Sequence, residues 1–199
     1  MINELISTLH DHYKDTCSII TEAIKRRDRL MLFVILTLGF FAFQTIFPTV
    51  SNTVVNDFLE FKFGLTLKLN LAVVGNIVWF LLLIFTMRYF QVAVFVERQY
   101  VYIHQLEEKL NKLIGQELIT REGKSYHHRY PIFSDWMWLI YTVIFPTLLL
   151  IVGIVKITLE LKYLYTAGWS LGLMLNTVAF ALLGVSVVLY LVVIHKKPK

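Results

Sequence analysis

The chain has 199 residues, of which 57% are apolar and only 17% are charged. Soluble domains are nearer half apolar and a quarter charged, so this composition excludes an ordinary soluble domain. Membrane topology accounts for the net charge of +5, and we expect no direct nucleic-acid binding. The single cysteine, Cys17, excludes an intrachain disulfide and a zinc site built on several thiolates.

Four apolar blocks are long enough to cross a lipid bilayer. A membrane helix needs about 20 mostly apolar residues, because the hydrocarbon core is about 30 Å thick. The blocks cover residues 30–47, 69–87, 136–155 and 170–194, and none contains Asp, Glu, Lys, Arg or His. Residues 1–29 are polar and lack the apolar core of a signal peptide, so we expect the first block to be retained. The sequence predicts an all-α integral membrane protein with four transmembrane helices.

Lysine and arginine are distributed unevenly between the segments that flank these blocks. Fifteen of the nineteen lie in residues 1–29, 88–135 and 195–199, and the other four lie in residues 48–68 and 156–169. The positive-inside rule assigns the cation-rich side to the cytoplasm. We therefore predict a multi-pass protein of the inner (plasma) membrane with both termini in the cytoplasm and two outer loops.

Two polar stretches continue the first two spans as predicted helices. No glycine or proline occurs between Met1 and Leu38 or between Asn76 and Ile114. In both stretches apolar residues recur at spacings of three and four, which is typical of an amphipathic helix. Because the first two spans are antiparallel neighbours, we predict that their extensions pack together as a cytoplasmic stalk. Two alternatives are helices lying flat in the membrane interface and an apolar face that binds another subunit or a partner protein.

The segment that leads from the stalk to the third span holds the densest polar cluster. We interpret it as a surface for anionic lipid or for a cytoplasmic protein partner. Metal binding by the two histidines is disfavoured, because adjacent residues rarely point the same way and no Cys or carboxylate pattern accompanies them. Phosphate or nucleic-acid binding by the cations and tyrosines is a further alternative. The candidate surface consists of Arg121, Lys124, Tyr126, His127, His128 and Arg129.

The two outer loops show strict alternation of apolar and polar residues. Apolar side chains take every second position from Phe61 to Leu71 and from Ile157 to Tyr163. A period of two indicates β-strands. We therefore expect a small sheet between the outer loops, in which Glu160 lies opposite Lys62 or Lys68.

Several polar residues lie inside the apolar blocks. Asn76, Thr142, Asn176 and Thr177 are expected to form hydrogen bonds between helices. The alternative is a pore lined by Asn76 or Asn176 in an oligomer. Ion-coupled transport is disfavoured because the blocks contain no ionisable residue.

Two further features concern helix packing in the third and fourth spans. Gly168 and Gly172 form a small-xxx-small motif at the start of the fourth span, which permits close helix approach. Pro146 lies within the third span and is expected to kink it. Such a kink has either a purely structural role or the role of a hinge in gating.

Sequence motifs of common enzymes are missing. The chain has no Gly-x-Ser-x-Gly elbow, His-Glu-x-x-His, P-loop or glycine-rich dinucleotide turn. We expect no catalytic residues, no metal and no cofactor.

The leading functional hypothesis is a homo-oligomeric membrane sensor or scaffold that couples to a cytoplasmic partner through its stalk. The architecture is similar in outline to membrane effectors and sensors of bacterial antiviral defence or toxin operons, a likeness of shape that carries no motif. The main alternative is a pore-forming or membrane-permeabilising effector. A small transporter or an integral-membrane enzyme is the third hypothesis.

Overall fold

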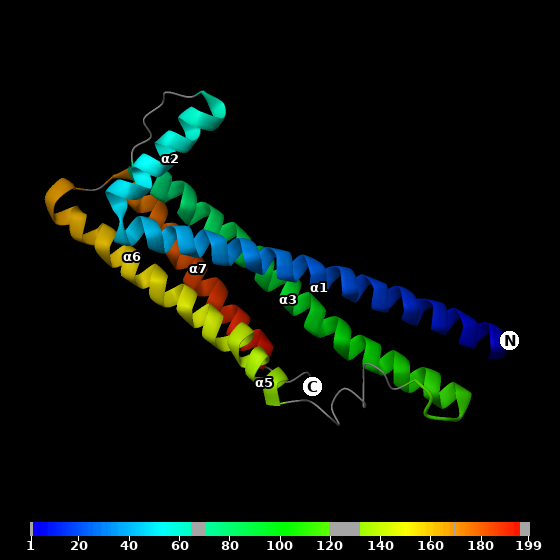
Figure 1. Ribbon diagram of the computed structural model, residues 1–199. Helices are drawn as coiled ribbons and strands as arrows, with labels where there is room; N and C mark the ends of the chain where they lie inside the picture. Colours follow the sequence, from blue (N-terminus) through cyan, green and yellow to red (C-terminus); the bar gives the residue numbers. More distant parts are fainter. Residues whose placement is uncertain (1, 65–70, 120–131, 169, 196–199) are drawn as a thin grey trace. The chain divides into compact units, whose positions relative to one another are not determined.

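The computed structural model describes residues 2–64, 71–119, 132–168 and 170–195 (Figure 1). Helices account for 94% of the structure, and the described residues contain no strand. The helices are α1 (Ile2–Ile46), α2 (Pro48–Phe63), α3 (Leu71–Ile114), α5 (Ile132–Leu139), the π-helix η1 (Ile140–Ile144), α6 (Phe145–Ala167) and α7 (Leu171–His195).

Four of the helical segments are long and apolar enough to cross a membrane, which confirms the predicted number of spans. These segments are Glu4–Ile46, Ala72–Ile114, Trp136–Lys162 and Leu171–His195. The protein is therefore a multi-pass membrane protein built from helices.

The predicted sheet between the outer loops is wrong where the structure describes them. Phe61–Phe63 are the last residues of α2, and Ile157–Tyr163 lie within α6. Residues 65–70 of the first alternating stretch lie outside the described residues. A helix satisfies its backbone hydrogen bonds within one segment, and this outweighs a weak strand pattern beside a bilayer.

The chain divides into two compact units, and both α1 and α3 contribute to each of them. The stalk unit comprises Met1–Arg29 and Tyr89–Tyr141. The bundle unit comprises Leu30–Arg88 and Thr142–Lys199. Both helices are continuous where they pass from one unit to the other, because Arg29–Leu30 lies inside α1 and Arg88–Tyr89 lies inside α3.

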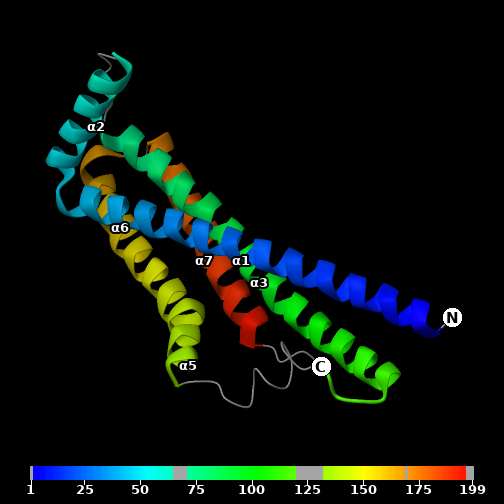
Figure 2. The same ribbon diagram turned by 45° about the vertical axis from the view of Figure 1, so that its right-hand side comes forward.

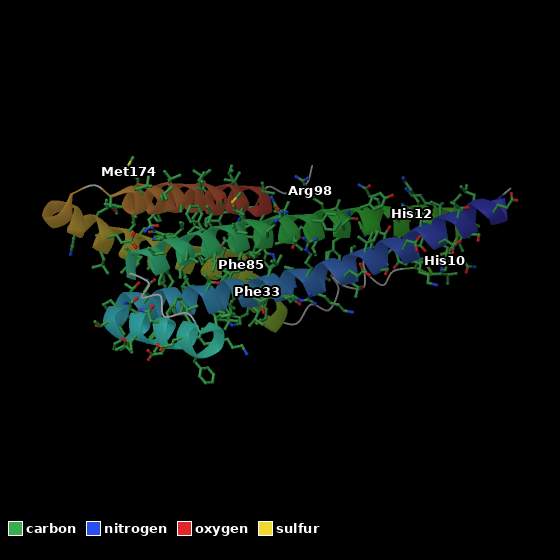
Figure 3. All side chains as sticks on the ribbon, turned by 90° about the horizontal axis from the view of Figure 1, so that it is seen from above. His10, His12, Phe33, Phe85, Arg98 and Met174 are labelled. Atoms are coloured by element: carbon green, nitrogen blue, oxygen red, sulfur yellow. The ribbon has the colours of Figure 1, made fainter. Side chains whose placement is uncertain are left out.

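In the stalk unit, α1 and α3 contact each other along their polar extensions. Tyr13 of α1 donates a hydrogen bond to the carboxylate of Glu107 in α3 at 3.0 Å. Figure 3 shows His12 pointing toward α3 and His10 pointing away from it. The buried residues of this unit recur at helical spacing, as the amphipathic pattern predicts, and include Thr16, Ile20, Val96, Ile103, Leu106 and Leu110.

In the bundle unit, each spanning helix buries one stripe and leaves apolar side chains on the rest of its surface. The stripe of α7 is spaced by three and four residues and consists of Leu173, Asn176, Ala179, Leu183, Val187 and Tyr190. Val178, Val185 and Met174 of α7 are each more than half exposed, and Met174 points away from the other helices (Figure 3). In a multi-pass membrane protein, such a surface faces lipid.

Two pairs of helices illustrate the packing inside the bundle unit. Helices α6 and α7 lie side by side in both views (Figures 1 and 2). Phe33 of α1 stacks on Phe85 of α3, with ring centroids 5.4 Å apart (Figure 3). Apolar packing of this kind holds membrane helices together through van der Waals contact.

The third span changes helix type directly before Pro146. The segment Ile140–Ile144 is a π-helix, and Pro146 is the second residue of the α-helix that follows. Proline has no backbone N–H to bond with the preceding turn, and π segments are sites of local irregularity in helices. The kink itself stays a prediction.

Residues expected to form a loop after the first span instead form α2. Pro48 occupies the first turn of α2, where the missing N–H costs nothing. The residue before a proline disfavours helical geometry, which ends α1 at Ile46. Gly64 ends α2 in the left-handed conformation, with φ of +64°.

Candidate functional site

The bundle unit contains an ion pair that the apolar blocks do not reveal. Because α6 continues beyond Val155, Lys156 and Glu160 lie on one face of a spanning helix, four residues apart. The Lys156 Nζ and Glu160 Oε1 atoms are 3.6 Å apart, and the two side chains are only 13% and 19% exposed. The candidate span that contains them runs from Trp136 to Lys162.

Glu160 also joins α6 to two other helices. Trp79 of α3 donates its indole N–H to Glu160 Oε1 at 3.3 Å. Asn176 of α7 donates its amide N–H to Glu160 Oε2 at 2.9 Å. Both donors are almost fully buried. Each carboxylate oxygen therefore has a donor, as a charge in a low-dielectric environment requires.

Aromatic rings extend this cluster to α1. The Lys156 ammonium lies 5.7 Å from the ring centroid of Phe41 in α1, within the range of a cation–π interaction. Phe41 meets Trp79 edge to face with centroids 4.7 Å apart, and Trp79 contacts Phe180 of α7 in the same manner at 6.1 Å. We name Phe41, Trp79, Lys156, Glu160 and Asn176 the polar cluster. All four spanning helices contribute to it.

Helices α3 and α7 approach closely beside the polar cluster. A Cβ atom at Gly172 would lie 2.7 Å from the side-chain nitrogen of Asn76. One turn after Gly172 the same helix carries Asn176. The close approach therefore depends on glycine and brings two of the predicted polar residues to neighbouring positions.

Asn176 has one polar atom that is not used by the cluster. Its side chain is 5% exposed, and its carbonyl oxygen Oδ1 is buried with no hydrogen-bond partner among the described residues. This oxygen is an acceptor beside the Glu160 carboxyl group. The cluster is therefore neutral in formal charge but retains one buried acceptor.

Three other predicted residues of the spans are Thr142, Pro146 and Thr177, which lie in η1, α6 and α7. Thr142 is buried in η1, and Pro146 is buried in α6. Thr177 donates its hydroxyl to the Leu173 carbonyl of its own helix at 2.8 Å. Such back-bonding satisfies the hydroxyl without linking two helices.

The predicted glycine motif at the start of the fourth span needs a correction. Gly168 precedes α7 and has a left-handed backbone, with φ of +75°. It therefore cannot share a helical face with Gly172. Of the two glycines, Gly172 is the one that takes part in close helix packing.

The helix of the third candidate span extends beyond the predicted apolar block 136–155 and includes Lys156 and Glu160. The alternating pattern from Ile157 onward predicts a strand, which would place Lys156 and Glu160 in a loop. Two signals favour the helix. There is no glycine or proline between Gly153 and Gly168, and Lys156 and Glu160 have the i,i+4 spacing of a helical ion pair. Trp79 and Phe41 carry no sequence signal beyond their hydrophobicity.

The predicted cytoplasmic surface lies outside the described residues. Its members are Arg121, Lys124, Tyr126, His127, His128 and Arg129. Within the described part of the chain, no group of three His, Cys, Asp or Glu side chains could hold a metal ion.

The stalk unit contains a second set of polar contacts. Glu107 is 3% exposed and accepts the hydrogen bond of Tyr13. Burial, followed by this hydrogen bond, raises the pKa of Tyr13 well above its ordinary value. Closer to the end of α3, the Asn111 side chain accepts hydrogen bonds from the N–H groups of Leu118 and Ile119 at 3.1 and 2.9 Å. These bonds fix the turn that follows α3.

A shallow depression of about 400 Å³ lies beside this turn. It is lined by His104, Glu107, Glu108, Asn111, Lys112, Gly115, Gln116, Glu117 and Ile119. All of these residues come from the end of α3 and the turn that follows it, so the depression belongs to one end of the stalk.

Comparison of the sequence and structure with protein-family models, curated proteins and solved structures gives no significant match. The assignment of a role to the polar cluster and to the stalk therefore depends on their geometry and chemistry.

Proposed function

We propose that this multi-pass protein is a non-enzymatic, homo-oligomeric sensor or scaffold of the plasma membrane. In this proposal it couples a change in its bundle to a soluble cytoplasmic partner. The observation that supports it is the continuity of α1 and α3, each of which runs through both units without a break. A continuous helix keeps its hydrogen bonds internal, so a rotation or shift at one end is carried along the axis to the other.

The polar cluster supports the sensing part of the proposal. Placing an ionisable residue inside a membrane helix costs free energy, so such residues usually have a function. Glu160 contacts α3 and α7 through hydrogen bonds. A change in its hydrogen-bond partners would therefore alter the packing of α3, which is one of the two helices that continue into the stalk.

The charge distribution supports a cytoplasmic location for the stalk. Fifteen of the nineteen Lys and Arg residues lie in segments that include Met1–Arg29 and most of Tyr89–Tyr141, and we expect such segments to be retained on the cytoplasmic side. We further propose that residues 121–129 bind either the partner or anionic lipid. A role in bacterial defence is an analogy of shape, and a nuclease or nucleotide-signalling gene beside this one would support it.

The proposal is tested by extracting the protein in mild detergent together with the co-expressed product of the neighbouring gene. We expect a mass that corresponds to several copies and a co-purifying partner. A strict monomer without a partner contradicts the proposal. Leu110→Asp, at a fully buried stalk position, should abolish partner binding, whereas Leu113→Asp, at a position 39% exposed, should leave the stalk packed.

A second candidate function is a pore or membrane-permeabilising effector. It is favoured by Asn176, Glu160 and the neighbouring Asn76, which lie close together inside the bundle unit. Overexpression should then depolarise cells, and Asn176→Leu should relieve the effect. Thr177→Val is the matched control, because Thr177 bonds only to its own helix among the contacts described. An unchanged membrane potential on overexpression contradicts this candidate.

The helix of the third candidate span carries two charged residues beyond the predicted apolar block, and charged residues within a membrane helix would be relevant to ion-coupled transport. Lys156 and Glu160 lie within a candidate span. No observation specifically favours a transported ion, however, so transport is not proposed.

A further inference from the structure

Helix α2 presents three different surfaces around its circumference. One surface is buried or half-buried and contains Ser51, Asn52, Val55 and Leu59. The second is exposed and apolar, with Val50, Val54, Phe58 and Phe61 at spacings of four, four and three. The third is exposed and polar, with Thr53, Asp57 and Glu60. With about 3.6 residues per turn, the apolar surface lies between the buried surface and the polar one.

The apolar surface of α2 is strongly exposed. Phe61 is 90% exposed, the highest value among the large apolar side chains described, and Val50, Val54 and Phe58 are 53%, 50% and 58% exposed. A contiguous apolar patch of this kind is rare on a surface that faces water. The polar neighbours Asp57 and Glu60 show that α2 is not fully immersed in hydrocarbon either.

The position of α2 in the chain identifies what covers this surface. Only Phe47 separates α2 from α1, whose apolar span ends at Ile46. Ile46 and Phe47 are 66% and 53% exposed, so the lipid-facing side of α1 continues directly into the apolar surface of α2. In Figures 1 and 2, α2 leads away from the end of α1 instead of running back along it.

We infer that α2 is an interfacial helix that lies in the membrane surface where α1 leaves the hydrocarbon. Val50, Val54, Phe58 and Phe61 are immersed among the lipid acyl chains, while Thr53, Asp57 and Glu60 face water. Amphipathic helices of this kind bury their apolar face about 5–10 Å into the boundary between headgroups and acyl chains. The inference does not depend on the proposed function.

Spin labelling of single cysteines tests the inference in the full chain. Cys17 is the only cysteine, so Cys17→Ser gives a cysteine-free background. Val54→Cys and Phe58→Cys report on the apolar surface, and Thr53→Cys and Glu60→Cys are matched controls on the polar surface. Val178→Cys on the lipid side of α7 gives the reference accessibility for a label in lipid, and Asp11→Cys on the stalk gives the reference for a label in water. Each labelled protein is reconstituted into phosphatidylcholine–phosphatidylglycerol vesicles and must first elute from a sizing column like the parent.

We expect labels at positions 54 and 58 to collide severalfold more with oxygen than with a water-soluble nickel chelate, as at position 178. The ratio should be reversed at positions 53 and 60. Nickel accessibility at 54 and 58 equal to that at position 11 would place the surface in water and overturn the inference. Low accessibility to both reagents would mean that another copy of the chain covers the surface, which also overturns it. If Phe58→Cys aggregates, Val50→Cys on the same surface replaces it.

Discussion

At the scale of single residues, Glu160 accepts the two hydrogen bonds that join α3 and α7 to α6 in the polar cluster. A buried ion pair loses much of its attraction to the cost of removing both charges from water. Glu160 offsets this cost through donors from α3 and α7 in addition to Lys156. Removal of one partner leaves the other charge poorly solvated, so the two members of the pair should be strongly coupled.

We predict that Lys156→Leu and Glu160→Leu each lower the stability of the detergent-solubilised protein by about 2–3 kcal/mol, because each leaves an unpaired charge. The double variant should be more stable than either single variant, since both charges are then absent. Lys162→Leu, at an exposed position of the same helix, is the control and should have little effect. Thermal unfolding measures all four. Additive losses in the double variant would show that the two charges do not interact.

In the stalk, the hydroxyl of Tyr13 is expected to contribute to stability through its hydrogen bond to Glu107. Tyr13→Phe removes the hydrogen bond to the buried carboxylate of Glu107 and should destabilise the stalk by about 1 kcal/mol. Tyr102→Phe removes the hydrogen bond between Tyr102 and His12, which is exposed, and should have a smaller effect. Hydrogen exchange of the stalk amides compares the two. Equal destabilisation by the two substitutions would contradict the larger contribution expected of the buried hydrogen bond.

The raised pKa of Tyr13 also predicts a pH dependence. Burial and the hydrogen bond to Glu107 favour the neutral phenol in the folded state and raise its pKa above the ordinary value of 10.0. The unfolded chain therefore loses this proton first, so the contribution of Tyr13 is complete below pH 10 and declines as the pH rises further. In Tyr13→Phe, the stability measured by circular dichroism should decline less steeply as the pH rises above 10. An identical decline would contradict the raised pKa.

At the scale of elements, the packing of α7 on α3 depends on Gly172. Gly172→Ala places a methyl group 2.7 Å from the Asn76 side chain, and we expect a loss of about 1–3 kcal/mol from overpacking. Asn76→Ala in the same protein should restore part of that loss. Gly184→Ala is the control, because its nearest neighbour would be 4.0 Å away. Thermal unfolding that shows no rescue by Asn76→Ala would exclude this contact as the cause.

The elements that the sequence predicts well are those whose side chains face a single environment. The blocks around Phe33 and Leu182 are mostly apolar because they face lipid or other helices, and composition alone finds them. The two amphipathic extensions are found for a different reason, because their apolar residues recur at the spacing of a helix. Composition fails at residues 48–64 and 156–163, where polar and apolar side chains alternate at the end of a span. There the helix is stabilised because it satisfies its own backbone hydrogen bonds near lipid. The spacing of apolar and polar side chains does not reveal this contribution.

The candidate site is only partly predictable. Asn76, Asn176 and Gly172 are visible because polar or small residues interrupt apolar blocks. Glu160 could not be assigned to the site, because its partners Trp79 and Asn176 lie 81 and 16 residues away in the chain, on other helices. Contacts between helices depend on rotation about each helix axis, and one sequence does not define that rotation.

At the scale of the whole molecule, the charge distribution predicts how the chain is inserted. A green fluorescent protein fused after Lys199 should fold and fluoresce, because the cation-rich segments stay in the cytoplasm. An alkaline phosphatase inserted after Gly64, where α2 ends, should be active only if that end of the bundle is exported. The opposite pattern would reverse the proposed orientation without affecting the four spans. Lys196→Glu and Lys197→Glu together serve as a control for the contribution of the tail.

Because it contains the π-helix η1, the third span should tolerate the deletion of one residue, whereas the regular α-helix of the fourth span should not. A π turn holds about one residue more than an α turn, so deletion of Val143 from Ile140–Ile144 would convert the turn to regular α-helix and leave both neighbouring segments in register. Deletion of Ala181 from α7 would instead turn all later residues by about 100° and move Tyr190 out of its buried stripe. We therefore expect the first deletion variant to insert and unfold much like the parent, whereas the second should be cleared by quality-control proteolysis.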